Sequence, residues 1–186
     1  MIASDLTALL RVPGRLVVAP SDLTIAFPYG GTYLGLVMGI AVSERHEMEL
    51  LREEMLGFAV PDGLELGEFY SLVAVVRDVR QGQAPNLFVG TETGAATGEA
   101  GAVVPSSTYA PGTALSARNT TLLFAPLDEL SHWFVFFTNA CPRPVDGDRD
   151  LDAVKEFGKP VRFLAFPRAS DGVAVRWKPK ADMVLT

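Results

Sequence analysis

The chain has 186 residues, of which 48% are hydrophobic and 20% charged, with 17 Gly and 13 Pro. This composition is too apolar for a disordered chain and is typical of one globular domain with many turns. The formal net charge of −6 argues against nucleic-acid binding as the main task, and the longest strongly apolar run, Leu34 to Val42, is too short to span a bilayer as a helix.

The first third of the chain combines breakers with short apolar segments. Ser4 is expected to cap a short helix that carries Leu6 to Leu10 and ends at Pro13. A short strand over 15–20 follows, and then a loop with tight turns. Residues 33–42 are β-prone, and their glycines indicate a bulge or a close backbone approach.

The segment 44–56 is ambiguous. Met48, Leu51 and Met55 recur at helical spacing, whereas Met48 and Leu50 between glutamates fit a strand. Local propensity alone favours a helix.

Three later segments are apolar on both faces of a strand, namely 67–79, 132–140 and 160–167. We expect both faces of each to be covered. Residues 173–178 follow a turn at Asp171-Gly172 and are predicted to form a hairpin with 160–167.

Residues 80–118 differ in character, because they are rich in Gly, Ala, Thr, Ser and Pro. One helical turn is expected at 86–89 within a long loop or arm. The sequence therefore predicts a single, mainly β domain over 1–186, with a short helix and one long arm.

Charge is distributed unevenly along the chain. Residues 44–68 hold eight acids and two bases, a net charge of −6, while residues 155–180 hold seven bases and two acids, a net charge of +5. In an oligomer, this asymmetry would make one subunit complementary to the next.

No arrangement of residues predicts catalysis or cofactor binding. The glycine-rich 90–98 lacks the Lys-Ser/Thr ending of a phosphate loop. The adjacent Glu53 and Glu54 would point to opposite faces of a strand and so would not share a site. His46 and His132 lie in no ligand-like cluster, and Cys141 has no evident base partner.

Metal binding and disulfides are likewise not predicted. The run at 146–157 begins like a calcium loop, but Leu151 and Phe157 stand where that loop needs Gly and Glu. One cysteine excludes an internal disulfide framework and indicates folding in a reducing cytosol. We expect no enzyme, no metal and no cofactor.

The order of elements resembles the tail tube proteins of long-tailed, siphovirus-like bacteriophages. Two stretches carry the resemblance: the "E-x-x-G … P … G-E-x … long strand" pattern of 53–79 and the "V-x-F-x-A-F-P … D-G" pattern of 161–172. They lie within an element order that spans about 33–178, whereas 1–32 has no part that aligns.

The resemblance implies a β-sandwich or half-barrel with a flanking short helix. It also implies hexameric rings whose inner strands join an inter-subunit β-barrel. Stacked rings would form the hollow tail tube through which DNA passes without specific binding. The protein would then be a structural virion protein, assembled in the host cytoplasm, whose partners are itself and neighbouring tail proteins. On this reading 44–56 is a strand, since sheet context overrides local propensity.

Two sets of residues acquire expected roles. Acids facing the lumen would repel DNA phosphates, and basic residues near the C-terminus would contact the next ring. The alternative for the acids is a solvated outer face. The lumen candidates are Glu44, Glu47, Glu49, Glu53 and Glu54; the inter-ring candidates are Arg168, Arg176, Lys178 and Lys180.

Other functions remain open. Within the same class the chain could be a tail terminator, a neck protein or a baseplate component. Outside it, the alternatives are a monomeric ligand-binding β-domain and, least favoured, a small hydrolase with an acidic pair.

Overall fold

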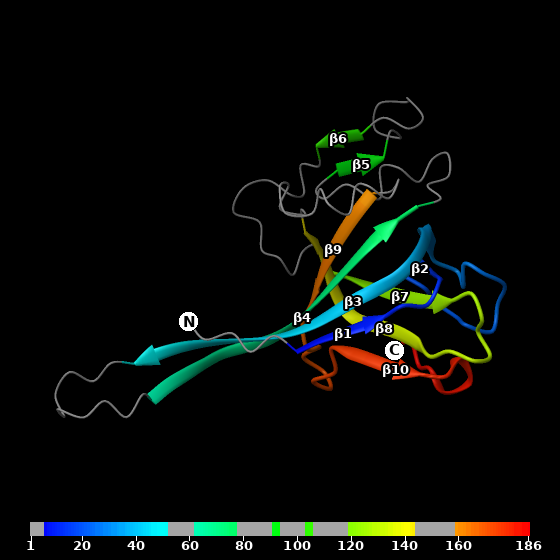
Figure 1. The fold of residues 1–186 in the computed structure, drawn as a ribbon. Helices are drawn as coiled ribbons and strands as arrows, with labels where there is room; N and C mark the ends of the chain where they lie inside the picture. Colours follow the sequence, from blue (N-terminus) through cyan, green and yellow to red (C-terminus); the bar gives the residue numbers. More distant parts are fainter. Residues whose placement is uncertain (1–5, 52–61, 78–90, 94–102, 106–118, 144–158) are drawn as a thin grey trace.

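The computed structural model describes residues 6–51, 62–77, 91–93, 103–105, 119–143 and 159–186 (Figure 1). These residues form ten β-strands and one 3₁₀ turn, Lys180–Asp182, with no α-helix among them. No helix in this part of the chain has the length and apolarity needed to cross a membrane. The strands are β1 (Leu6–Leu10), β2 (Gly14–Val18), β3 (Thr32–Leu51), β4 (Asp62–Val76), β5 (Thr91–Thr93), β6 (Val103–Pro105), β7 (Thr120–Pro126), β8 (Phe134–Arg143), β9 (Lys159–Ala165) and β10 (Val175–Lys178).

Six strands close an antiparallel barrel in the order β3-β2-β7-β8-β9-β4, and β4 returns to pair with β3. Two strands bend from one set of neighbours to another as they cross the barrel. Residues 32–37 of β3 pair with β2 and residues 40–44 pair with β1, both on the same edge. Similarly, β8 pairs first with β10 and then with β9. The separate pair β5–β6 stands apart from this sheet.

The mainly β prediction is confirmed, and the barrel closes within one chain. The predicted helix at Leu6–Leu10 is wrong, because these residues form β1 and pair with Ile40 to Glu44 of β3. A ready strand edge outweighs the helical spacing of three leucines. The strand alternative for 44–56 is confirmed as far as Leu51, while 52–56 and the expected helical turn at 86–89 lie outside the described residues.

The predicted hairpin between 173–178 and 160–167 is also wrong. β10 pairs with Phe134 to Phe137 of β8. The hairpin cannot form because both edges of β9 are already paired, one with β4 and the other with the second half of β8. The first half of β8 is the edge that remains.

The interior of the barrel is apolar and receives side chains from all six barrel strands. This inner cluster includes Leu16, Val37, Leu72, Phe124, Phe137 and Phe163, each at most 5% exposed. A second, outer cluster lies on the opposite face of β7 and β8. There, Leu123, Phe134 and Phe136 are covered by Leu23, Tyr29 and Met183.

β8 is therefore buried on both faces, as its sequence predicts, and the cover comes from the same chain. The loop between β2 and β3 and the C-terminal segment supply it. On β4, by contrast, Val73 and Val75 on the outer face stay half-buried.

Glycines permit two irregularities in β3, as the sequence predicts. The register with β4 shifts between Val37 and Ile40, and the register with β2 shifts opposite Gly35, whose φ is 151°. A Cβ on Gly39 would lie 2.5 Å from the carbonyl oxygen of Leu10. β1 can approach β3 only because that position is glycine.

Candidate functional site

The pair β3–β4 continues beyond the barrel as a projecting two-stranded ribbon (Figure 1). β1 leaves β3 at Glu44, and β9 leaves β4 at Tyr70. From there, 45–51 pair only with 62–69, and no other described strand pairs with either outer edge. We call these two segments the arm. At about 3.3 Å per residue, its seven β3 residues extend roughly 23 Å.

The register of the arm contains one bulge. Glu47 lies opposite Gly67 and Met48 opposite Glu65, so Leu66 has no opposing residue. A bulge of this kind bends its strand and increases the local twist. The arm is therefore a twisted ribbon rather than a flat one.

The arm is strongly acidic. Its segments 45–51 and 62–69 contain Glu47, Glu49, Asp62, Glu65 and Glu68 against the single base Arg45, a formal charge of 1 − 5 = −4. Such an excess of one sign attracts a basic surface and repels phosphates.

The structure places three of the predicted lumen acids, in two different settings. Glu44 lies where the barrel meets the arm, opposite Tyr70, while Glu47 and Glu49 belong to the arm itself. Glu53 and Glu54 lie outside the described residues. Strand pairing also places Glu65 and Glu68 of β4 in the arm, although neither is among the predicted lumen residues.

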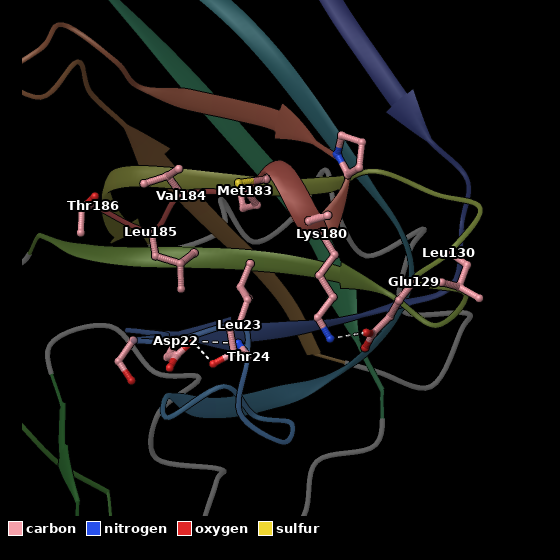
Figure 2. A pocket seen from close by; sticks show the side chains of 13 residues that line it. Asp22, Leu23, Thr24, Glu129, Leu130, Lys180, Met183, Val184, Leu185 and Thr186 are labelled. Atoms are coloured by element: carbon pink, nitrogen blue, oxygen red, sulfur yellow. Dashed lines mark hydrogen bonds and ion pairs between the residues drawn. The ribbon is translucent and has the colours of Figure 1, made fainter.

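At the other end of the barrel, three connecting segments surround an open groove of about 860 Å³. They are the loop between β2 and β3, the turn between β7 and β8, and the C-terminal segment (Figure 2). Leu23, Met183 and Leu185 supply apolar wall, and Leu130 at the rim is 99% exposed.

Three side chains tie these segments together, and we call them the clasp. The buried Tyr29 hydroxyl donates to Oε1 of Glu129, and Nζ of Lys180 donates to Oε2 of Glu129 at 2.7 Å. Lys180 Nζ also lies 5.0 Å from the centroid of the Tyr29 ring, within cation–π range.

The clasp has a consistent electrostatic signature. Burial, followed by the hydrogen bond to Glu129, raises the pKa of Tyr29. Burial also acts to raise the pKa of Glu129, but the hydrogen bonds from Lys180 and Tyr29 outweigh it and lower that pKa. The carboxylate is therefore held ionised, which suits a structural tie.

The four basic residues predicted as inter-ring contacts lie near one another in the chain but differ in their partners. Arg168 and Arg176 both pair with Asp171, with Arg176 Nη2 at 3.1 Å from Oδ2, and Lys180 pairs with Glu129. The hydrogen bond from Arg168, together with that from the Val173 N–H and the nearby charges of Arg168 and Arg176, lowers the pKa of Asp171 to about 2. Lys178, at the end of β10, is exposed and forms no ion pair with a described residue.

The described residues offer no metal centre, since no three His, Cys, Asp or Glu side chains among them are grouped to hold an ion. Cys141 is buried in β8, His132 lies in the turn between β7 and β8, and His46 belongs to the arm. The Asp-rich run at 146–150 lies outside the described residues.

Comparisons with protein families, with curated proteins and with solved structures each give no match for this chain. The function is therefore inferred from the geometry of the arm, the groove and the basic C-terminal region.

Proposed function

We propose that this protein is a self-assembling structural subunit of a virion, which forms stacked rings that make up a phage tail tube. The observation that carries the proposal is the arm. Its two strands leave a closed barrel and present outer edges that no described strand covers.

A two-stranded ribbon with open edges is a poor structure for an isolated monomer. Isolated hairpins are marginally stable in water, and open edges pair with other chains unless they are blocked. The six barrel strands, in contrast, close on themselves. An arm of this length is therefore best explained as a strand pair that completes its hydrogen bonding with a second copy.

The rotational symmetry of a ring uses such edges efficiently. If the outer edges of each arm pair with strands of neighbouring subunits, these strands join into one inter-subunit barrel and the edges of the arm are covered. In this proposal the sandwich or half-barrel of the tail tube proteins corresponds to the arm and the strands beside it. The number of subunits, six, rests on the resemblance alone.

The charge of the arm fits a conduit for DNA. With a formal charge of −4 on each arm, a ring of arms would have a strongly negative inner surface that repels phosphates and prevents sticking. Glu47 and Glu49 stand two residues apart on β3, and residues two apart on a strand share one face.

The test is the assembly state of the purified full-length chain. Size-exclusion chromatography with light scattering and negative-stain microscopy should show rings or tubes that become more abundant with concentration. A monomer at every concentration would contradict the proposal and would favour a ligand-binding β-domain that uses the groove. Rings that never stack would favour a tail terminator, neck or baseplate component.

A second measurement addresses the conduit. Glu47→Lys together with Glu49→Lys should leave tubes able to form at high salt, yet make them retain double-stranded DNA in a filter-binding assay. Wild-type tubes should not retain it. If the variant tubes also release DNA, these acids do not face the lumen.

A further inference from the structure

The strand β10 presents a further open edge in the described sheet. Its one described partner is β8, which pairs with it from Val175 to Lys178. The Thr138 N–H donates to the Ala174 carbonyl at 3.0 Å, so Thr138 and Ala174 are a hydrogen-bonded pair. Hydrogen-bonded and non-hydrogen-bonded residue pairs alternate along β8 and β10 from that point. In an antiparallel pair, the backbone groups of Val175 and Trp177 therefore point away from β8.

The two faces of β10 differ in character. Val175 and Trp177 pack against the inner cluster, so Arg176 and Lys178 take the outer face. The side chain of Arg176 is 14% exposed and is bound to Asp171 and to the Val184 carbonyl. Lys178 is exposed.

The arm and β10 complement each other in charge. The arm carries a formal charge of −4, whereas residues 168–186 carry four bases and two acids, a net charge of +2. The arm projects from one end of the barrel, while β10 and the C-terminal segment lie toward the other (Figure 1). The arm and β10 of one chain are thus placed to meet different copies.

The charges also match in spacing. Arg176 and Lys178 lie two residues apart on β10, as Glu47 and Glu49 do on β3. When one strand is added beside another, residues two apart on the first lie opposite residues two apart on the second. Opposite charges at such positions stabilise the pairing, and like charges oppose it.

We propose that the outer edge of β10 receives the β3 edge of the arm from a second copy of this chain, with Glu47 and Glu49 opposite Arg176 and Lys178. This inference rests on the proposed self-assembly and names the surfaces that make the contact. The contact is head to tail, so each subunit uses its arm on one neighbour and its β10 on the other.

The experiment compares charge variants of the full-length chain by light scattering and microscopy over a range of concentration and salt. Lys178→Glu should raise the concentration needed for assembly on the order of tenfold at low salt. Arg11→Glu is the matched control. It makes the same charge reversal at an exposed position between β1 and β2, and this variant should assemble like the wild type. Far-UV circular dichroism and thermal melting show that each variant is folded.

A charge swap tests direct contact. Glu47→Lys with Glu49→Lys should also weaken assembly, and combining these changes with Lys178→Glu should restore part of it, because one of the two opposed pairs becomes attractive while Arg176 still faces a lysine. Hydrogen exchange should show that the β10 amides and the arm become protected together on assembly.

The outcomes separate this inference from the proposed function. If the wild type assembles and Lys178→Glu assembles equally well, the β10 contact is wrong and self-assembly stands. If the arm variants fail but the swap restores nothing, the arm pairs elsewhere, and the β10 contact is again wrong. A wild type that never assembles overturns both.

Discussion

The strand β8 and the arm show two different ways of covering a strand. Phe134, Val135, Phe136 and Phe137 of β8 are each 0% exposed, because successive residues enter the inner and outer clusters of the same chain. The arm differs, because no described strand pairs with its outer backbone edges. Apolar faces can be covered within one domain, whereas edges of a projecting ribbon need another chain.

This contrast changes the basis for expecting assembly. The sequence predicts that strands with two apolar faces are covered on both sides, and in a ring the neighbouring subunits could supply that cover. For β8, the β2–β3 loop and the C-terminal segment provide that cover. The drive to assemble is then expected to come from backbone pairing and charge, with a smaller apolar contribution from half-buried Val73 and Val75.

The largest expected effect tests whether the two faces of β8 are equally part of the core. Phe137→Ala removes an aromatic side chain from the inner cluster and Phe136→Ala removes one from the outer cluster. Each should lower the free energy of unfolding by about 3–5 kcal/mol, measured by urea denaturation. A loss below about 1 kcal/mol for Phe136→Ala would show that the outer cluster is weakly packed.

A smaller effect is expected where β2 pairs with its neighbour β7. A Cβ on Gly14 would lie 2.3 Å from Cε2 of Phe124 and 2.8 Å from the Ala125 carbonyl oxygen. Gly14→Ala should therefore cost about 1–3 kcal/mol of unfolding free energy, because the ring or the backbone must move. Gly172→Ala is the comparison, since it meets no atom within 4 Å and costs only the strain of its φ of 69°.

The clasp gives a pH-dependent effect. Glu129→Gln should lower the unfolding free energy by about 1 kcal/mol at pH 7, since the ion pair with Lys180 is partly exposed. The pKa of Glu129 is lowered by folding, so its contribution is complete above the ordinary value of 4.5 and is lost as pH falls through the folded pKa. Urea titrations at several pH values should show wild type and variant converging in acid; a constant difference would place the effect elsewhere.

The smallest expected effect concerns the arm in the monomer. In dilute protein, Glu47→Lys with Glu49→Lys should change the unfolding free energy by no more than about 0.5 kcal/mol, because surface substitutions away from the core have small effects. The same variant should lose assembly at low salt. A large loss of monomer stability would mean that the arm is part of the folding core, and the contrast with β8 would fail.

Much of the fold follows from local patterns in the sequence. The strands β4, β8 and β9 are long apolar runs bounded by breakers, and the bulges of β3 follow from its glycines. Two errors share one cause. Leu6–Leu10 becomes a strand and β10 joins β8 because of which edges are open in the finished sheet, and no local window contains that information.

The candidate site divides in the same way. The acidic arm was predictable, since Glu47 and Glu49 lie in a charged run next to a strong strand. The clasp was not predictable, because Tyr29 and Glu129 lie 100 residues apart and Lys180 another 51 beyond. Each is an ordinary surface-type residue in its own segment, and only the closure of the barrel brings them together.

Closure of the barrel within one chain separates folding from assembly. Where subunits share a core, a dissociated chain often has no stable fold of its own. Here the six barrel strands enclose their apolar interior before any neighbour arrives. If the chain assembles as proposed, a subunit released by dilution or salt should therefore remain folded and able to assemble again without a refolding step.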